Sequence, residues 1–253
     1  MKVFLTGASS GLGEELARHY TRAGATLGLF ARRETELARL AAALAPATVA
    51  TYPGDVRDAA TLASAAADFI ARFGAPDIVI ANAGVSRGTL TDEPGDLPAF
   101  RTVFDTNVLG IVHTFSPFMA ALRNARAGTL VGIASVAGFR GLPGAGAYSA
   151  SKAAAIVYLE SLRVELAGSG VSVVTICPGF IATPMTADNP YKMPFLLAPD
   201  KAVRLMARAI ARRRRFYVLP WQMAWLGVIL RHVPRPLYDR VVAGRKRKPR
   251  HFD

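Results

Sequence analysis

Cysteine and histidine are scarce in this sequence, and their scarcity argues against disulfide-bonded and metal-dependent proteins. Cys177 is the single cysteine among 253 residues, so the chain cannot form an internal disulfide. It ends the apolar run 171–177, where we expect a small buried side chain. The four histidines do not combine with cysteine at the spacing of a zinc site, and we predict no metal.

A hydrophobic signal segment is also lacking near the N-terminus. The first apolar run ends at Leu5, and Thr6 and Gly7 follow at once. A secretory signal needs an apolar region of about 7–15 residues, so we expect the cytoplasm.

Acidic residues are nearly absent from the last part of the sequence. Residues 201–253 contain 15 lysines and arginines but only Asp239 and Asp253, whereas residues 1–200 contain 16 residues of each sign. The whole net charge of +13 therefore lies in the C-terminal part. This asymmetry suggests an anionic partner for that part rather than for the whole chain.

Apolar runs alternate with helical patterns along the chain, which is 51% hydrophobic. The runs that predict strands are 3–5, 26–30, 48–52, 77–81, 129–134, 171–177 and 216–219. The helical patterns are 11–22, 34–44, 58–73, 100–124, 147–167 and 199–213. Apolar strands that alternate with helices are typical of the α/β class with a doubly wound parallel sheet. We expect a single domain, with residues 1–220 as its body and an apolar, basic and helical C-terminal extension at 221–253.

A glycine-rich segment follows the first predicted strand. Residues 6–13 read T-G-A-S-S-G-L-G, with glycines at 7, 11 and 13, and lead into a predicted helix. Such glycines allow a tight turn and a close approach of backbone to a pyrophosphate, which the helix N-terminus also attracts. The spacing differs from the commoner G-x-G-x-x-G, so an ordinary glycine-rich turn is the alternative when this segment is considered alone.

Tyr148 and Lys152 are four residues apart in a predicted helix, and Ser135 follows a predicted strand. Side chains four apart share one helix face, so a phenol and an ammonium would lie side by side. With a nearby hydroxyl, this set could perform acid–base chemistry on a carbonyl or an alcohol. The alternative is a half-buried tyrosine beside a lysine that extends to solvent.

Together these segments resemble the short-chain dehydrogenase/reductase family in its single-domain form, over roughly residues 1–220. The matching positions are the loop 6–13, Asp55-Val56, Asn82-Ala83-Gly84, Asn107, Ser135, Tyr148 with Lys152, and Pro178-Gly179 with Thr183. One departure is Ala81, where the family usually has a further asparagine. The resemblance implies a Rossmann-type fold and an oxidoreductase that moves a hydride between a nicotinamide and a carbonyl or alcohol.

The resemblance also implies four catalytic residues. Tyr148 would be the general acid in reduction and the base in oxidation. Lys152 would favour the phenolate electrostatically and bind the nicotinamide ribose, and Ser135 would hold and polarise the substrate oxygen. Asn107 would order a water that connects Lys152 to solvent, although a solvent-facing polar residue is the alternative for it.

The end of the second predicted strand indicates which nicotinamide binds. NAD-preferring members of the family carry an acidic residue there, whereas this chain has Ala31 followed by Arg32 and Arg33. Because guanidinium groups match a ribose 2′-phosphate, we predict NADP(H) with Arg32 as the main clamp; a solvated helix entry is the alternative. The other residues expected to bind the cofactor are Gly7, Ser9, Ser10, Gly11, Leu12, Gly13, Asp55, Val56, Asn82, Ala83, Gly84, Tyr148, Lys152, Pro178, Gly179, Ile181 and Thr183.

Segment 180–200, after the sixth predicted strand, is the expected substrate loop. It contains prolines at 184, 190 and 194, so we expect a mobile lid rather than one regular helix. Its many apolar side chains predict an apolar substrate. The residues expected to contact the substrate are Ser135, Phe139, Tyr148, Met185 and Tyr191.

The extension combines an apolar segment with basic residues. Four arginines at 212–215 precede 15 uncharged residues, and a polybasic end follows. An uncharged run of that length, interrupted by Pro220, is short of the ~20 residues that span a bilayer. Segment 212–253 therefore either makes a peripheral contact with the inner face of a membrane or packs on the protein with a solvated basic end. We expect no nucleic acid, because no recognised nucleic-acid-binding fold accompanies the charge.

The sequence as a whole predicts an NADP(H)-dependent oxidoreductase that interconverts a ketone or aldehyde and an alcohol on a hydrophobic substrate. A 3-oxoacyl-thioester reductase and a non-catalytic, NADP-sensing protein on the same fold are the alternatives. Members of the family usually associate through two long helices, here 100–124 and 147–167, so we expect a homodimer or homotetramer.

Overall fold

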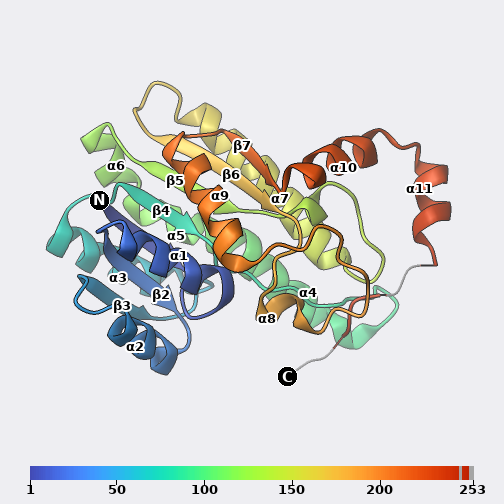
Figure 1. The fold of residues 1–253 in the computed structure, drawn as a ribbon, viewed down its shortest axis with the longest axis horizontal. Helices are drawn as coiled ribbons and strands as arrows, with labels where there is room; N and C mark the ends of the chain where they lie inside the picture. The colour runs from blue at the N-terminus through green and yellow to red at the C-terminus, as the bar shows by residue number, and fades with distance from the viewer. Residues whose placement is uncertain (245–246, 251–253) are drawn as a thin grey trace.

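A seven-stranded parallel sheet forms the centre of the computed structural model, which describes residues 1–244 and 247–250 (Figure 1). The strands are β1 (Lys2–Thr6), β2 (Thr26–Ala31), β3 (Val49–Pro53), β4 (Ile78–Ala81), β5 (Thr129–Ile133), β6 (Ser172–Pro178) and β7 (Phe216–Leu219). Their spatial order is β3-β2-β1-β4-β5-β6-β7, and neighbours pair in parallel. The predicted α/β class with a doubly wound parallel sheet is confirmed, and each predicted strand ends within one residue of the observed one.

Helices cover both faces of this sheet. They are α1 (Gly11–Arg22), α2 (Glu34–Ala43), α3 (Ala59–Phe73), α4 (Leu97–Phe104), α5 (Gly110–Phe115), α6 (Met119–Ala125), α7 (Gly146–Glu165), α8 (Pro184–Ala187), α9 (Pro199–Ala211), α10 (Trp221–His232) and α11 (Arg235–Val242). Buried residues of α1, α2 and α9 join one hydrophobic core, and those of α3, α5 and α7 join the other. The sheet therefore lies between two helical layers.

Strand β1 shows why the strands read as continuous apolar runs. Val3 and Leu5 belong to the core on one face of the sheet, whereas Phe4 belongs to the core on the other face. Successive side chains of a strand point to opposite faces, so a strand covered on both sides is apolar at every position. Phe4 packs edge-on against Phe69 of α3, with 5.5 Å between ring centres.

The predicted helix 100–124 is irregular in the structure. It begins at Leu97 and contains a π-helical turn at Asp105–Leu109 and a 3₁₀ turn at Ser116–Phe118. Pro117 occupies the 3₁₀ turn, and a proline inside a helix removes one backbone donor and disturbs the regular pattern. The π turn contains Asn107, and π turns inside helices often occur at functional sites. The prediction of one long helix over 100–124 is therefore corrected, because these two turns interrupt it.

The C-terminal extension forms α10 and α11, which lie to one side of the sheet beyond β7 (Figure 1). Helix α10 packs on the body through its small and flexible residues. A Cβ at Gly227 would lie 2.5 Å from the Phe139 ring, and a Cβ at Gly179 would lie 2.8 Å from the Met223 side chain. Tyr238 of α11 donates a 2.6 Å hydrogen bond to the carbonyl oxygen of Gly141. Within the described residues, no helix is both long and apolar enough to cross a bilayer.

Candidate active site

A cavity of about 450 Å³ opens at the carboxyl ends of the strands. It lies where the strand order reverses between β1 and β4, which is the usual ligand position in such sheets. All the residues that the sequence predicted to bind the cofactor line it, together with Ser135 and Met185. Asn107, Phe139 and Tyr191 are not among the lining residues.

The glycine-rich loop after β1 is packed too tightly for larger side chains. Gly7 has a φ of +68°, and a Cβ there would lie 2.7 Å from the Cα of Ala83. A Cβ at Gly13 would overlap the carbonyl oxygen of Gly7. The Asn82 side chain fixes this turn by donating to the carbonyl oxygens of Thr6 and Gly7, at 3.0 and 3.2 Å. The loop therefore brings bare backbone and the N-terminus of α1 to the cavity, which is how proteins cradle a pyrophosphate.

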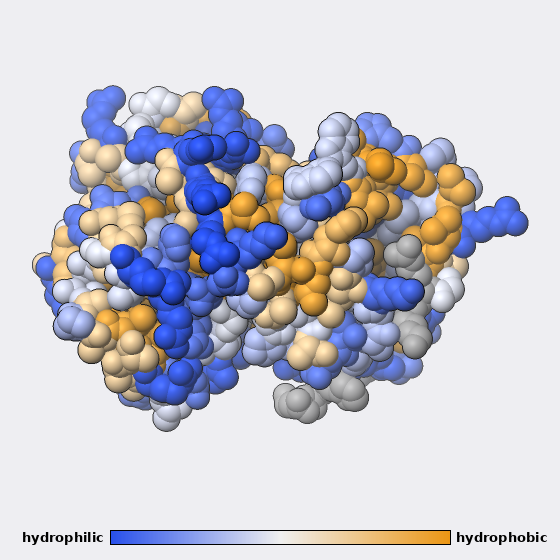
Figure 2. All heavy atoms as spheres, in the orientation of Figure 1, coloured by the Kyte–Doolittle hydropathy of each residue, from blue (hydrophilic) through white to orange (hydrophobic). Residues whose placement is uncertain are grey.

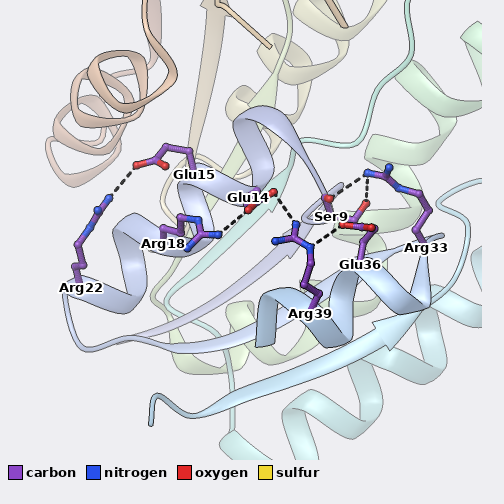
Figure 3. Close-up of polar contacts among 8 residues, drawn as sticks. All are labelled: Ser9, Glu14, Glu15, Arg18, Arg22, Arg33, Glu36 and Arg39. Atoms are coloured by element: carbon purple, nitrogen blue, oxygen red, sulfur yellow. Dashed lines mark hydrogen bonds and ion pairs between the residues drawn. The ribbon is translucent and has the colours of Figure 1, made fainter. Parts of the chain in front are cut away.

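Two arginines follow β2, at the rim of the same cavity. Arg33 donates to the carbonyl oxygen and the hydroxyl of Ser9, at 3.0 and 3.2 Å, so it bridges α2 and the loop after β1 (Figure 3). Arg32 lines the cavity but makes no hydrogen bond or ion pair with any described residue. A guanidinium that is held by Ser9 and a second one that is exposed together give this rim a positive charge.

Further along α2, Arg39 joins the first two helices. It forms ion pairs with Glu14 of α1 and Glu36 of α2, at 3.3 and 2.9 Å (Figure 3). These pairs are exposed and lie away from the lining residues, so we assign them to the packing of α1 against α2.

Asp55 closes the far side of the cavity after β3. Burial pushes the pKa of this carboxyl upward, but hydrogen bonds and charge from Arg57 outweigh burial and hold the pKa below its usual range. The Asp55–Arg57 ion pair measures 2.7 Å. Asp55 therefore stays ionised and acts as a hydrogen-bond acceptor at this end of the cavity.

Helix α7 carries Tyr148 and Lys152 into the cavity. Lys152 is 4% exposed, and its Nζ donates a 2.8 Å hydrogen bond to the carbonyl oxygen of Ile133. Burial lowers the pKa of Lys152 to about 8. The Nζ lies 5.9 Å from the centre of the Tyr148 ring. The two side chains share one face of α7, as their spacing predicts.

Ser135 lies at the end of β5 and caps the short turn Val136–Gly138. Its hydroxyl accepts a 3.1 Å hydrogen bond from the backbone N–H of Ala137. Burial raises the pKa of Tyr148, and a hydrogen bond with Ser135 opposes that rise. The Ser135 hydroxyl and the Tyr148 phenol therefore lie together in the cavity. Lys152 is not among the groups that shift the pKa of Tyr148, so its expected attraction for the phenolate stays a prediction.

Asn107 links Val85, a residue of the cavity wall, to Ser151 of α7. Its side chain accepts from the backbone N–H of Val85 at 2.8 Å and donates to the Val85 carbonyl oxygen at 2.9 Å. It also donates to the Ser151 hydroxyl at 3.0 Å. Because Asn107 is fully buried, the alternative of a solvent-facing residue is wrong. A Cβ at Gly84 would lie 3.2 Å from the Asn107 oxygen and 3.5 Å from the Lys152 Nζ, so these side chains lie close together.

The residues predicted for the substrate side fall into two groups. Met185 of α8 lines the cavity. The Tyr191 ring packs against the Phe180 ring, with 6.3 Å between their centres, and Tyr191 contributes to the raised pKa of Tyr148. Phe139 instead lies beneath α10, against Gly227. Its ring contacts the Arg231 guanidinium at 4.6 Å, away from the lining residues.

Other lining residues were missed by the sequence interpretation. Val85 and Thr106 directly neighbour the predicted Gly84 and Asn107, and Thr186 stabilises the start of α8 together with Thr183. Adjacency to a motif was the signal that could have identified the first two. Within the ranges that the structure describes, no group of three or more His, Cys, Asp or Glu side chains could hold a metal ion.

Comparisons with known proteins agree with this geometry. The family model described as short chain dehydrogenase matches residues 1–193. An uncharacterized oxidoreductase of Myxococcus xanthus is 40% identical over 237 residues, which cover 93% of each chain. A solved 3-ketoacyl-ACP reductase from Sinorhizobium meliloti is similar with a TM-score of 0.77 and 26% identity, over 86% of this chain and 96% of the other. An alcohol dehydrogenase from Thermococcus sibiricus, solved with 5-hydroxy-NADP, is similar with a TM-score of 0.76 and 27% identity, over 86% and 94%.

Proposed function

The chain belongs to the short-chain dehydrogenase/reductase family, and we propose that it is an NADP(H)-dependent oxidoreductase interconverting a hydrophobic ketone or aldehyde and its alcohol. The observation that carries this proposal is the position of Ser135, Tyr148 and Lys152 in the same cavity as the glycine-rich loop. A reacting oxygen beside the phenol would thus lie within the cavity that suits a dinucleotide.

The cavity has the features that a dinucleotide needs. Its volume of about 450 Å³ is within the usual range of ~300–1,000 Å³ for small-molecule sites. The packing around Gly7 and Gly13 leaves bare backbone for the pyrophosphate. Arg32 and Arg33 favour NADP(H) over NAD(H), because each can pair with a 2′-phosphate. The end of β2, where an acidic residue would favour NAD(H), carries Ala31 instead. The similarity to an alcohol dehydrogenase that was solved with 5-hydroxy-NADP supports the same choice.

Proton transfer in this proposal is the task of the chain's own residues. The cofactor, when bound, donates the hydride in reduction or accepts it in oxidation. Tyr148 donates its phenolic proton to the substrate oxygen in reduction and removes that proton in oxidation. The Ser135 hydroxyl donates a hydrogen bond to the same oxygen and polarises it. The Lys152 ammonium stabilises the phenolate that remains, and Asn107 holds α7 against the segment after β4 through Ser151 and Val85.

A panel of carbonyl compounds tests this function directly. We expect the purified protein to oxidise NADPH with ketones or aldehydes, and to turn over larger apolar ones better than small polar ones. NADH should support a lower rate, because it lacks the phosphate that pairs with Arg32. Turnover with NADH alone, or with small polar carbonyls alone, would contradict the proposal in its details.

A 3-oxoacyl-thioester reductase is the second candidate, favoured by the similarity to a 3-ketoacyl-ACP reductase. The two candidates differ in how the substrate is presented, as a free apolar molecule or as a carrier-bound acyl chain. Comparing a free ketone with a 3-oxoacyl thioester of equal chain length would separate them. A rate that is much higher for the thioester would favour the second candidate.

Self-association through α4, α5 and α7 is a further part of the proposal. Val157 and Val164 of α7 expose 65% and 62% of their surface, and Leu109 beside α5 exposes 47%. Apolar side chains on these neighbouring helices suit a contact between two copies of the chain. Light scattering coupled to size-exclusion chromatography should give a dimer or tetramer, and Val157→Glu should shift it towards the monomer.

A further inference from the structure

Helices α10 and α11 carry an exposed apolar surface on the outer side of the molecule. Figure 2 shows hydrophobic residues gathered over these two helices. Trp221, Trp225, Val228 and Ile229 follow helical spacing along one side of α10 and expose between 51% and 68% of their surface. Leu237 and Val241 of α11, four residues apart, expose 53% and 58%. We call these six residues the α10–α11 face.

Positive charge surrounds this apolar face. Arg231, Arg235 and Arg240 are exposed on the same two helices, and Asp239 is their one acidic residue. Among the described residues from 201 onward, ion pairs form at Arg204 and Arg250 only. Arg235 and Arg240 therefore keep their charge available for an anionic partner, whereas the Arg231 guanidinium also contacts the Phe139 ring at 4.6 Å.

The inner side of α10 contacts segments next to the cavity. Met223 packs against Gly179, which lines the cavity, and Gly227 packs against Phe139, four residues after Ser135. The α10–α11 face and the active site thus lie on opposite sides of one helix. Any partner that covers the α10–α11 face would therefore lie close to the cavity.

We propose that the α10–α11 face docks on an anionic lipid membrane and lies in its interface. Exposed tryptophans and aliphatic side chains, on two helices that also carry exposed arginines, match the apolar and headgroup layers of such an interface. Each exposed arginine adds attraction for acidic headgroups. A second copy of the chain fits less well, because a two-fold contact would bring Arg231, Arg235 and Arg240 towards the same arginines of the other copy.

Docking gives the proposed hydrophobic substrate a short path from the lipid to the cavity. This consequence rests on the proposed function, whereas docking itself does not. The helix that touches the lipid on one side holds Met223 against Gly179 on the other. Docking would therefore place the lipid close to Gly179, a residue that lines the cavity.

The two tryptophans make a direct test convenient. Trp221 and Trp225 are the only tryptophans of the chain, so tryptophan fluorescence, excited selectively, reports on the α10–α11 face alone. Adding vesicles of phosphatidylcholine with phosphatidylserine should shift the emission to the blue, and lipids brominated in their acyl chains should quench it. Pure phosphatidylcholine vesicles should give a much smaller change, and added salt should weaken the binding to the anionic vesicles.

Variants separate the charge of the face from its apolar surface. Arg231→Gln, Arg235→Gln and Arg240→Gln together should weaken binding to anionic vesicles by on the order of a hundredfold at low salt. The matched control removes the same charge elsewhere through Arg101→Gln, Arg123→Gln and Lys201→Gln, and should bind as the original protein does. Trp221→Ser with Trp225→Ser, followed by vesicle flotation, should abolish binding while turnover of a water-soluble carbonyl continues.

The outcomes distinguish the proposal from its rivals. Absence of a blue shift and of flotation with anionic vesicles overturns docking, whether or not the protein reduces carbonyls. Equal loss of binding in the control variant means that total charge, and not this face, attracts the membrane, and also overturns it. Self-association that the Trp221→Ser and Trp225→Ser substitutions abolish would assign the face to a second copy instead. Binding without any carbonyl turnover would refute the proposed function and leave docking intact.

Discussion

The active site and the C-terminal extension are held in place by different kinds of contact. In the candidate active site, buried and half-buried side chains bind backbone atoms of neighbouring strands and loops. The buried Lys152 binds the Ile133 carbonyl oxygen, and the half-buried Asn82 binds those of Thr6 and Gly7. The extension is attached through the packing of Met223 and Gly227 and through hydrogen bonds of Arg140 and Tyr238. Arg140 donates to the carbonyl oxygens of Leu230 and Val233, at 3.1 and 3.2 Å.

Because of this difference, the chemistry of the active site and the attachment of the protein to a surface depend on different residues. Short buried hydrogen bonds hold the reacting groups in a fixed geometry and are little affected by salt. Exposed apolar and charged side chains leave the α10–α11 face responsive to whatever surface it meets. Substitutions in the active site should therefore change the chemistry, whereas substitutions in the extension should change attachment and access.

Tyr148→Phe should have the largest effect, because it removes the group that transfers the proton. General acid–base catalysis contributes typically about 10²–10⁴-fold, and we expect a loss of turnover in this range. NADPH binding, measured by fluorescence titration, should be unchanged. Tyr158→Phe, on the same helix but outside the lining residues, is the control and should keep its activity. Full activity in Tyr148→Phe would refute the assignment.

Lys152→Met should stabilise the fold most at neutral pH and progressively less as the pH rises. Burial lowers the pKa of Lys152 to about 8, below the ordinary value of about 10.5, so the unfolded chain binds more protons than the folded one between these values. The unfolding free energy of the original protein should therefore rise with pH in this interval. At pH 7, the buried charge costs about 3 kcal/mol, because the pKa falls from 10.5 to about 8 on folding.

Urea denaturation of both proteins near pH 7 and pH 9.5 measures this dependence. The advantage of Lys152→Met should shrink at the higher pH, and turnover should fall at both. A difference in stability that does not change with pH would show that Lys152 is not buried in its charged form.

Arg32→Ala should weaken NADPH binding by about tenfold or more, in line with the ~1.5–3 kcal/mol of a charge-assisted hydrogen bond. NADH binding should stay the same, because NADH has no 2′-phosphate. Arg39→Ala, which breaks pairs with Glu14 and Glu36 farther along α2, is a matched control. If the Arg32→Ala substitution weakens both cofactors equally, Arg32 is not the phosphate clamp, and Arg33 becomes the residue to test.

Asp96→Asn should have the smallest effect on turnover and a clear effect on the C-terminal segment. The Arg250 guanidinium donates to both carboxylate oxygens of Asp96, at 2.9 and 3.1 Å, and lowers its pKa, so the pair is intact at neutral pH. Pro249 also accepts a 3.0 Å hydrogen bond from the Gly88 N–H. Limited trypsin digestion should cleave at Arg247 several-fold faster in Asp96→Asn. The exposed Asp92→Asn is the control, and equal rates in all three proteins would contradict a clamp at Asp96.

The sequence predicted the sheet and the cofactor side of the cavity for a simple physical reason. Parallel strands that are covered on both faces are apolar throughout, so their ends are easy to find. Motifs at those ends must meet at one edge of the sheet, which is why the loop 6–13, Asn82 and Lys152 all line one cavity. Glycines such as Gly13 marked positions where no side chain fits.

Features that depend on distant contacts could not be predicted. The π turn around Asn107 accompanies hydrogen bonds with Val85, 22 residues earlier. Phe139 lies beneath α10 because Gly227 leaves room for its ring. The pairing of Arg250 with Asp96 joins residues 154 positions apart, and no local pattern indicates it.

Transfer of deuterium from the cofactor to the product tests the central claim most directly. NADPH with deuterium at both C4 positions of its nicotinamide ring would be incubated with an apolar ketone that the protein turns over, and the alcohol would be analysed by mass spectrometry and NMR. We predict one deuterium on the carbinol carbon, one NADPH consumed for each alcohol formed, and transfer slower by about 10²–10⁴-fold with Tyr148→Phe. Tight NADPH binding without deuterium transfer to any carbonyl of the panel would contradict the account, and would indicate a protein that binds the cofactor without catalysis.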